Sequence, residues 1–342
     1  MKAVVTGGGG FVMANFLRHW LEADPGNKAV CLDAAPLDAA AQRYFEPVRD
    51  RLQIVQGDVS DARTWQQLPA DTDYVVHGAA VTSHAYTDAN GQRRDPEREN
   101  PLRVLSTNIL GTGQALEWAR DLRGLRRFVY VSTGSVYADA VPEQERDPFP
   151  LPEEGYIGPR LLYDISKYSG ELIVRRLTEL HALAAYTVRL SSVFGPMDRP
   201  TPARNVRNIA NFVAHAAAEG RAVRAINADA VGDYVYAPDV ADALYRLLRA
   251  PAKQLRHDIY NIACGKTATI RDLVACARAT APNLSLEITG ADKAEIRVGA
   301  DQRTGRWGAY DISRAEADFG WRPRALGDAL QDYIAWLREN RR

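Results

Sequence analysis

A glycine-rich run only six residues into the chain constrains the fold more than any other feature. Residues 6–13 read TGGGGFVM and separate a β-branched apolar run from a stretch with helical periodicity. Glycines at such a junction permit a tight turn and let anions approach backbone N–H groups at the helix start. We therefore expect a strand–turn–helix unit in which Gly7, Gly10, Phe11 and Val12 are candidates for binding the phosphates of a cofactor. A plain glycine-rich turn is the alternative, because such patterns also occur by chance.

Short apolar runs alternate with longer amphipathic stretches through the first 190 residues. The strand-like runs are Lys2–Thr6, Ala29–Asp33, Leu52–Gln56, Asp73–His77, Arg127–Ser132 and Tyr186–Leu190. The helix-like stretches are Phe11–Ala23, Asp61–Leu68, Arg98–Leu122 and Tyr163–Leu183. The apolar runs have the length and composition of strands buried on both faces. This alternation predicts an α/β fold, a doubly wound parallel sheet of the Rossmann type.

Asp33 closes the second predicted strand, twenty-three residues after Gly10. A carboxylate at this place can accept hydrogen bonds from both adenosine ribose hydroxyls, and it would repel a 2′-phosphate. The segment between Cys31 and Gln42 contains no Lys or Arg that would attract such a phosphate. The pattern favours NAD over NADP as cofactor; the alternative is an Asp that only caps the next turn.

Composition excludes several classes of protein. The 43 basic and 43 acidic side chains balance, which gives no electrostatic reason to expect nucleic acid or an anionic membrane as partner. No run of about eighteen apolar residues occurs, so we expect no membrane span. Cys31, Cys264 and Cys276 have neither CxxC nor metal-ligand spacing, and we interpret His77 as a buried strand end. We therefore expect a cytoplasmic protein with no metal.

Tyr163 and Lys167 are four residues apart in a stretch of helical periodicity, which places both on one helix face. Lys167 is the only lysine between Lys28 and Lys253, in a chain with six lysines and thirty-seven arginines. A phenol with its ordinary pKa of about 10 is a poor base at neutral pH, and a nearby ammonium favours the phenolate. The pair is a candidate acid–base site; a solvated i,i+4 pair is the alternative.

These residues belong to an ordered set of motifs that spans essentially the whole chain. The blocks are TGGGGFV (6–12), GDVSD (57–61), HGAAVT (77–82), NILGT (108–112), VSTGSVY (131–137), YDISK (163–167), RLSSVFGP (189–196), DYVYAPDVADA (233–243) and FGWRP (319–323). In this order they resemble the extended short-chain dehydrogenase/reductase family, which includes NAD-dependent sugar epimerases and dehydratases. The resemblance implies an enzyme that uses NAD.

The resemblance also implies roles for individual residues. The catalytic set would be Thr133, which orients the substrate oxygen, Tyr163, which takes its proton, and Lys167, which also bonds the nicotinamide ribose. Asn108 would support the site from behind. Further cofactor contacts would come from the adenine-flanking Asp58 and Val59 and from the channel-lining Ala79, Ala80 and Thr82.

The chain departs from the family pattern at four places. Met13 stands where relatives usually have the glycine that allows close helix–strand packing. Gly134–Ser135 replaces the Asp–Glu pair with which dehydratases of this family eliminate water. Ser192 and Gly232 replace the Asn and Arg that hold the diphosphate in nucleotide-sugar epimerases, and an Arg is hard to replace in that task.

We therefore expect an NAD-dependent oxidoreductase or epimerase that acts on a secondary hydroxyl of a small sugar-like or hydroxy-acid substrate, with simple dehydrogenation slightly favoured. The alternatives are a nucleotide-sugar epimerase with an altered diphosphate pocket and a non-catalytic NAD-binding regulator. Candidate anion-binding residues are Arg199, Arg204, Arg303 and Arg306, each of which could equally be a solvated side chain.

The same patterns predict domain organisation and assembly. We expect residues 1–190 to form an NAD-binding Rossmann domain and residues 191–342 to form mainly a substrate-binding lobe, with some segments returning to the first domain. The stretches Arg98–Leu122 and Tyr163–Leu183 carry more apolar surface than one side of a sheet needs. In the family that the chain resembles, the equivalent helices pair across a two-fold axis. A homodimer is expected; the alternative is that the C-terminal lobe covers these helices.

Overall fold

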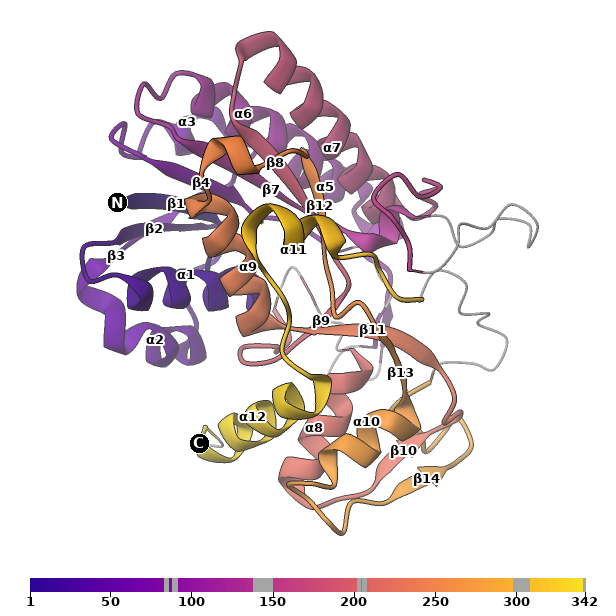
Figure 1. The fold of residues 1–342 in the computed structure, drawn as a ribbon. Coiled ribbons are helices and arrows are strands. Elements are labelled where there is room, and N and C mark those ends of the chain that lie inside the picture. The colour runs from indigo at the N-terminus through magenta and orange to yellow at the C-terminus, as the bar shows by residue number, and fades with distance from the viewer. Residues whose placement is uncertain are drawn as a thin grey trace.

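A parallel sheet with the strand order β12-β8-β7-β4-β1-β2-β3 organises the protein (Figure 1). The computed structural model describes residues 1–82, 86–87, 92–137, 150–201, 204, 208–297 and 308–340. Every neighbouring pair in this sheet is parallel. This architecture confirms the predicted α/β class. The strands are β1 (Lys2–Thr6), β2 (Lys28–Asp33), β3 (Leu52–Gln56), β4 (Tyr74–His77), β7 (Arg127–Thr133), β8 (Ala185–Leu190) and β12 (Ile259–Ile262).

Helices cover both faces of the sheet because its central strands are apolar on both sides. Along β1, Ala3 and Val5 face one core, whereas Val4 faces the other. The first core is covered by α1 (Phe11–Ala23), α2 (Ala39–Phe45), α9 (Ala237–Arg249) and α11 (Ser313–Phe319). The second core is covered by α3 (Ala62–Trp65), α6 (Gly111–Arg120) and α7 (Leu162–His181).

Two predicted helices differ from the structure. The stretch Asp61–Leu68 contains only α3, a single turn. The stretch Arg98–Leu122 is divided at Asn100, because the following Pro101 disfavours helical geometry at the residue before it. The pieces are α4 (Pro96–Glu99), α5 (Pro101–Leu105), a π-helical turn at Ser106–Leu110 and α6.

The remaining elements form a second, smaller core (Figure 1). This core contains α8 (Ile209–Glu219), α10 (Ile270–Ala277) and α12 (Leu326–Glu339), together with the short sheets β13-β11-β9 and β10-β14. Both β12 and α9 come from the C-terminal part of the sequence but complete the large sheet and its helical cover. The strands are β9 (Ser192–Phe194), β10 (Val223–Ala225), β11 (Val231–Tyr236), β13 (Thr267–Thr269) and β14 (Leu286–Ile288), and a separate hairpin is formed by β5 (Tyr86–Thr87) and β6 (Arg93–Arg94).

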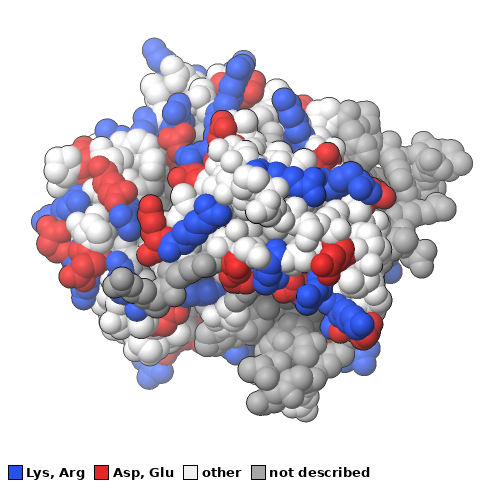
Figure 2. Space-filling view, turned by 90° about the horizontal axis from the view of Figure 1, so that it is seen from below, with Lys and Arg blue, Asp and Glu red and all other residues white. Residues whose placement is uncertain are grey.

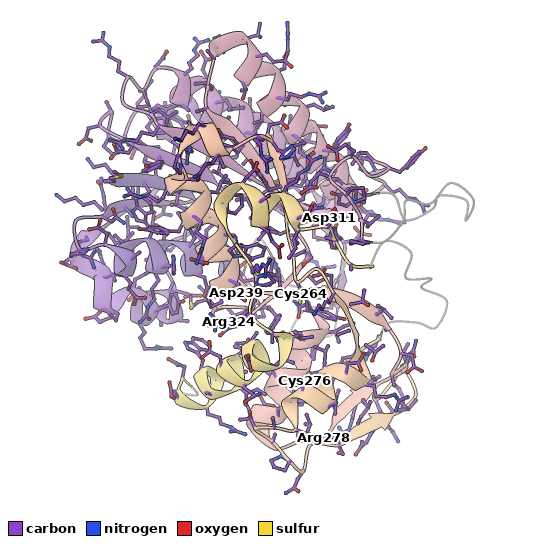
Figure 3. The ribbon with its side chains drawn as sticks, in the orientation of Figure 1. Asp239, Cys264, Cys276, Arg278, Asp311 and Arg324 are labelled. Carbon is purple, nitrogen blue, oxygen red and sulfur yellow. The ribbon has the colours of Figure 1, made fainter. Side chains whose placement is uncertain are left out.

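A buried carboxylate at the start of α9 links that helix to the chain that enters α12. Asp239 forms an ion pair with Arg324 at 2.7 Å, and its second oxygen accepts the Arg324 backbone N–H at 3.0 Å. The indole of Trp321 donates to the Asp239 carbonyl at 2.9 Å. Figure 3 shows Asp239 and Arg324 between the large sheet and the smaller core. These bonds fix how the two parts of the chain meet.

The side chain of Met13 fills space that is open because Gly78 has no side chain. It is almost fully buried in the core beneath the sheet. A Cβ atom on Gly78, which directly follows β4, would lie 2.5 Å from both Cγ and Sδ of Met13. Helix α1 can therefore carry methionine at this position because the facing residue is glycine.

Charge distribution and helix composition indicate what kinds of surface the chain presents. On the face shown in Figure 2, basic and acidic side chains are interspersed. Within the described ranges, none of the helices has the length together with the apolar composition that crossing a bilayer demands.

Candidate active site

Parallel pairing brings the carboxyl ends of the central strands to one edge, and the predicted site residues follow those ends. The glycine-rich loop follows β1, Asp33 ends β2, and residues 79–82 come shortly after β4. Thr133 is the last residue of β7, the neighbour of β4. Most of the candidate cofactor and catalytic residues therefore share one edge of the sheet.

The glycine-rich loop requires glycine at its first turn. Gly7 has a φ of 69°, and a Cβ atom there would lie 2.9 Å from Cα of Ala79. Gly10 is the N-cap of the thirteen-residue helix α1, which has no side-chain cap and no acidic residue in its first turn. Phe11 is buried and Val12 is packed against the same core. The backbone N–H groups at this helix start are suited to a phosphate.

Asp33 is oriented by backbone donors. Its Oδ2 accepts from Gly9 N at 3.0 Å and its Oδ1 from Ala35 N at 3.1 Å. Burial raises the pKa of this carboxyl, while the backbone hydrogen bonds act in the opposite direction. Each oxygen has a further lone pair, so the carboxylate can also accept ribose hydroxyls.

The structure places Asp58 and Val59 just beyond the end of β3. The exposed Asp58 carboxylate accepts both the N–H and the hydroxyl of Ser60 at 2.8 Å, which closes a turn. Val59 is buried, and its methyl group would meet a Cβ atom on Gly111 at 2.6 Å. Their contact with adenine stays a prediction.

A hydroxyl–imidazole pair joins the ends of β1 and β4. Thr6 Oγ1 accepts from the backbone N–H groups of Gly78 at 3.1 Å and Ala79 at 3.0 Å, and it bonds His77 Nδ1 at 2.9 Å. His77 Nε2 lies 3.2 Å from the Thr112 hydroxyl. Burial lowers the pKa of His77 to about 3, so the ring is neutral at physiological pH. His77 therefore supports the strand ends as a buried, hydrogen-bonded group.

Asn108 connects the segment after β4 to helix α7. Its Oδ1 accepts from Val81 N at 2.8 Å, and its Nδ2 donates to Val81 O at 3.0 Å and to Ser166 Oγ at 2.8 Å. It lies in the π-helical turn, a feature often found at functional sites. Ala79, Ala80 and Thr82, the candidate channel residues, are partly exposed on the segment that Asn108 holds.

Tyr163 and Thr133 meet through their hydroxyl groups. Tyr163 is half-buried in the first turn of α7, where burial raises the pKa of its phenol to about 12. The hydrogen bond with Thr133 and the charge of Arg204 both favour the phenolate. Thr133 Oγ1 also lies 3.2 Å from Ser135 Oγ. Three hydroxyls thus converge at the end of β7.

Lys167 is one helical turn after Tyr163 and only 2% exposed. Its Nζ lies 4.4 Å from the centre of the Tyr130 ring, and it donates no hydrogen bond within the described part of the chain. Burial lowers the pKa of its ammonium to about 7, and Glu171 opposes this shift. A buried amino group with unused donors fits the hydroxyls of a nicotinamide ribose.

The sequence interpretation missed the buried ion pair behind Lys167. Glu171 bonds Arg189 through Oε2 at 2.6 Å, and its Oε1 accepts from the Ser132 hydroxyl at 2.5 Å. Both charged side chains are almost fully buried. The available signal was the Lys167–Glu171 spacing of four residues, which puts Glu171 on the same helix face.

Two of the four candidate arginines lie beside the glycine-rich loop. Arg204 pairs with the buried Asp198, and its guanidinium carbon lies 5.1 Å from the centre of the Phe11 ring. Arg199 pairs with Asp38 and contacts the Gly9 carbonyl. Neither is the solvated side chain that the alternative interpretation allowed. Arg303 and Arg306 lie outside the described residues.

Buried tyrosines occupy the space beside the two glycines that depart from the family pattern. A Cβ atom on Gly134 would collide with the hydroxyl of Tyr310. A Cβ atom on Gly232 would lie 2.7 Å from Cζ of Tyr234. A longer side chain at either position would have to displace a packed ring.

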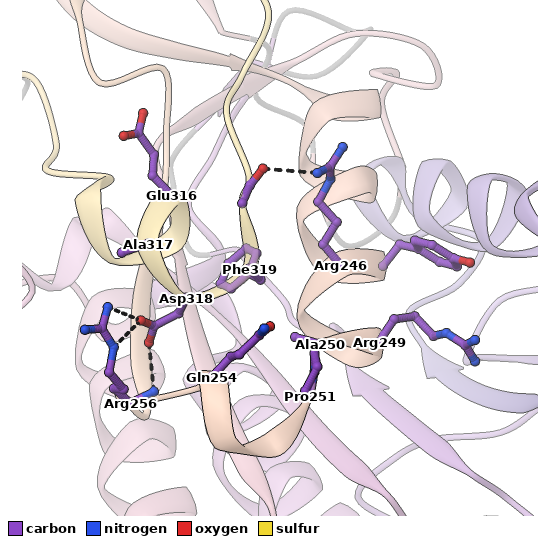
Figure 4. Close-up of a pocket in the computed structure, with 12 residues that line it drawn as sticks. Arg246, Arg249, Ala250, Pro251, Gln254, Arg256, Glu316, Ala317, Asp318 and Phe319 are labelled. Carbon is purple, nitrogen blue, oxygen red and sulfur yellow. Dashed lines mark hydrogen bonds and ion pairs between the residues drawn. The ribbon is translucent and has the colours of Figure 1, made fainter.

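A separate hollow lies at the opposite, amino-terminal edge of the sheet (Figure 4). It is lined by the end of α9, the approach to β12 and the end of α11. Arg256 is paired with Asp318 at 2.7 Å, and Arg246 donates to the Gly320 carbonyl at 3.0 Å. These guanidinium groups are already used within the protein, and the hollow is remote from Tyr163.

Comparisons with known proteins agree with this geometry. A family model described as "NAD dependent epimerase/dehydratase family" matches residues 3–263. A dTDP-glucose 4,6-dehydratase of Mycolicibacterium smegmatis is 29% identical over 99% of this chain and 94% of its own. The crystal structure of a UDP-glucose 4-epimerase from Thermotoga maritima has a TM-score of 0.77 and 24% identity, with both chains covered completely. A GalE-like L-threonine dehydrogenase from Cupriavidus necator also has a TM-score of 0.77, with 20% identity over 98% of this chain and all of its own.

The depressed pKa of Lys167 predicts a pH-dependent cost in stability. Because the folded-state pKa is about 7 instead of 10.5, the unfolded chain binds a proton that the folded chain lacks between these values. We expect the melting temperature of the wild type to rise relative to that of Lys167→Met as the pH increases from about 7 to about 9.5. Calorimetry across this range measures the difference.

Lys253→Met, which changes an exposed lysine, is the control. Its melting temperature should differ from that of the wild type by the same amount at every pH in this range. Parallel profiles for Lys167→Met and the wild type would contradict the assignment of a buried, weakly basic ammonium.

Proposed function

The chain belongs to the NAD-dependent epimerase/dehydratase family, and on this premise we propose that it exchanges a hydride between nicotinamide and a secondary hydroxyl of a small sugar-like or hydroxy-acid substrate. Tyr163 is the acid/base of this reaction. Gly7, Gly10, Phe11 and Val12 would hold the dinucleotide phosphates, and Asp33 the adenosine ribose.

One observation carries the proposal. The half-buried phenol of Tyr163 bonds the hydroxyl of Thr133 at the end of β7, and the buried ammonium of Lys167 lies one helical turn away. Thr133 ends β7, and Tyr163 and Lys167 lie on the adjoining helix α7. The same edge of the sheet carries the glycine-rich loop and Asp33. Lys167 is almost fully buried and has no ion-pair partner among the residues that the structure describes. A structural role alone does not require a lysine in such a position.

Thr133, Tyr163 and Lys167 have different roles in the proposed proton transfer. NAD, when bound, supplies the hydride acceptor at C4 of its nicotinamide. Thr133 orients the substrate hydroxyl toward Tyr163, which takes the proton while the carbon–hydrogen bond breaks and the carbonyl forms. Lys167 stabilises the Tyr163 phenolate that accepts this proton, and it would also bond the nicotinamide ribose. Positioned proton transfer of this kind contributes roughly 10²–10⁴-fold to the rate.

The two glycines covered by tyrosines support a substrate without a nucleotide diphosphate. At Gly134 the chain lacks the acid that a dehydratase of this family would need, and Tyr310 fills the adjoining space. At Gly232 the ring of Tyr234 covers the position from which an arginine would reach a diphosphate. Simple dehydrogenation of a free sugar, sugar acid or hydroxy acid is therefore slightly favoured over epimerisation.

A nucleotide-sugar epimerase with an altered diphosphate pocket is the second candidate. The observation in its favour is the similarity along almost the whole chain to a putative UDP-glucose 4-epimerase of Methanocaldococcus jannaschii, which is 24% identical. A non-catalytic NAD-binding regulator is the third candidate; the complete Thr133–Tyr163–Lys167 set speaks against it, because a sensor needs no acid–base pair.

The structure also supports proposals about the domains of the protein and its cellular location. We propose that residues 1–190 form the NAD-binding domain and that residues 191–342 form mainly the substrate lobe. Strand β12 joins the large sheet and α9 covers it, which supports the expectation that some segments of residues 191–342 return to the first domain. Free thiols at Cys31, Cys264 and Cys276 support a cytoplasmic location.

Replacing the phenol hydroxyl tests the proposed chemistry. We expect Tyr163→Phe to lose about 10²-fold or more in turnover while NAD still binds, because only proton transfer is removed. Activity is measured by screening free sugars, aldonates, uronates, hydroxy acids and sugar nucleotides for NADH at 340 nm. Product isomers are examined in parallel by NMR.

Tyr168→Phe removes a phenol oxygen from the same helix and should keep its activity. NADH that accumulates identifies a dehydrogenase, whereas a new isomer without NADH identifies an epimerase. Full activity of Tyr163→Phe would refute the role of this residue, and NAD binding without turnover of any substrate class would favour the regulator.

We also propose a homodimer with a two-fold interface built from α5, α6 and α7. Of the eight large apolar side chains that are well exposed in the described residues, five lie on these helices or on the π-helical turn between them. Their exposure speaks against the alternative that the C-terminal lobe covers them. The five are Leu102, Leu110, Ile165, Leu172 and Leu180.

A charge in this apolar face should prevent assembly. We expect Leu172→Glu to convert the dimer to a monomer of 37.8 kDa at micromolar concentration, measured by light scattering. Ile288→Glu, at a 57% exposed position on β14, is the matched control and should remain dimeric. A monomeric wild type would refute the proposed dimer. A Leu172→Glu variant that remained dimeric would place the interface elsewhere.

A further inference from the structure

Arg199 is far from the glycine-rich loop in sequence but lies beside it in the structure. Its Nη2 donates to the Gly9 carbonyl at 3.2 Å. Its Nε and Nη2 bond the two carboxylate oxygens of Asp38 at 2.7 Å and 2.8 Å. Asp38 in turn caps α2 by accepting from Ala41 N at 2.8 Å. One guanidinium therefore bridges the loop after β1 and the helix that follows Asp33.

The segment that carries Arg199, residues 195–201, is also fixed at its start; we call it the strap. Asn15 of α1 donates to the Pro196 carbonyl at 2.8 Å, and its own oxygen accepts from Tyr44 at 3.0 Å. Met197 is buried and has a φ of 69°, which a non-glycine residue adopts only when its surroundings hold it there. Arg199 Nη1 bonds the Met197 carbonyl at 3.2 Å.

Gly9 connects this strap to the carboxylate expected to hold the adenosine ribose. Its N–H donates to Asp33, whereas its carbonyl accepts from Arg199. Because Asp33 and Arg199 both bond the same residue, they lie close together. Burial raises the pKa of the Asp33 carboxyl, and the charge of Arg199 opposes that rise. The strap therefore lies at the adenosine end of the candidate NAD site.

We propose that the Asp38–Arg199 pair is a positioning element that holds residues 195–201 against the adenosine end of the NAD site and slows release of the dinucleotide. The inference rests on the proposed placement of NAD along the glycine-rich loop. Asp38 has a second effect: it neutralises a guanidinium that would otherwise attract a 2′-phosphate close to Asp33.

The dissociation rate of NAD tests this role. Asp38→Asn and Arg199→Gln should each release NAD about fivefold faster than the wild type, which corresponds to about 1 kcal/mol for a half-exposed, doubly bonded ion pair. The double variant should be no faster than the singles, because both remove one interaction. Arg322→Gln, which breaks the exposed Arg322–Glu316 pair, is the control and should not change the rate.

Unchanged release from both single variants would overturn the proposal. Additive effects would overturn it too, because they would mean that each residue contacts NAD independently.

Affinity for NADP tests where the guanidinium lies. Asp38→Asn leaves the charge of Arg199 uncompensated, so its affinity for NADP relative to NAD should rise by about fivefold. Arg199→Gln should show no such rise. Equal ratios in the wild type and both variants would contradict a position beside the 2′-hydroxyl.

Hydrogen–deuterium exchange of the protein without NAD provides a readout that is independent of the cofactor. Peptides covering residues 195–201 should exchange faster in Asp38→Asn and Arg199→Gln than in the wild type, whereas α12 should be unchanged. Identical exchange would show that the pair does not hold the strap. If the wild type bound no NAD, the proposed function would fail, while exchange would still report whether the pair holds the strap.

Discussion

Parallel strand pairing is the constraint on which the other features of the site depend. Because β1, β2, β4 and β7 all run in one direction, the residues that follow them meet at one edge without further design. The Thr6–His77 pair then fixes the ends of two of these strands, and Asn108 joins the next segment to α7. Glycines at positions 7 and 78 allow the chains to approach closely enough for these bonds.

The buried ammonium of Lys167 lowers the stability of the fold at the place where the proposed reaction uses it. Lys167 is buried against an aromatic ring, and its pKa of about 7 shows that the fold disfavours its charged form. Glu171 would favour the charge, but the buried Arg189 already engages it. A full ion pair with Glu171 would hold the ammonium away from a ligand; the observed arrangement leaves its donors available. In the proposed reaction, the uncompensated burial of Lys167 lowers the stability of the fold but leaves the ammonium available to a ligand.

Local patterns predicted the strands, the glycine-rich turn and the Tyr163–Lys167 face, because these features depend on residues that are close in sequence. The break at Pro101 was also visible in the sequence, but the apolar periodicity outweighed it. Contacts between distant segments could not be predicted. No cation occurs between positions 31 and 42, yet Arg199 reaches this region from the C-terminal half. The contact between Gly134 and the ring of Tyr310 likewise joins segments that are far apart in the sequence.

The central claim is that the carboxyl edge of the sheet, with Asp33 at its adenosine end, binds NAD. Calorimetric titration of the purified protein with NAD and with NADP tests it most directly. The carboxylate should make NAD bind at least about tenfold tighter, or about 1.4 kcal/mol, because it accepts the ribose hydroxyls and repels a 2′-phosphate. Asp33→Ala should narrow this difference. Equal affinities of the wild type for the two dinucleotides would contradict the account.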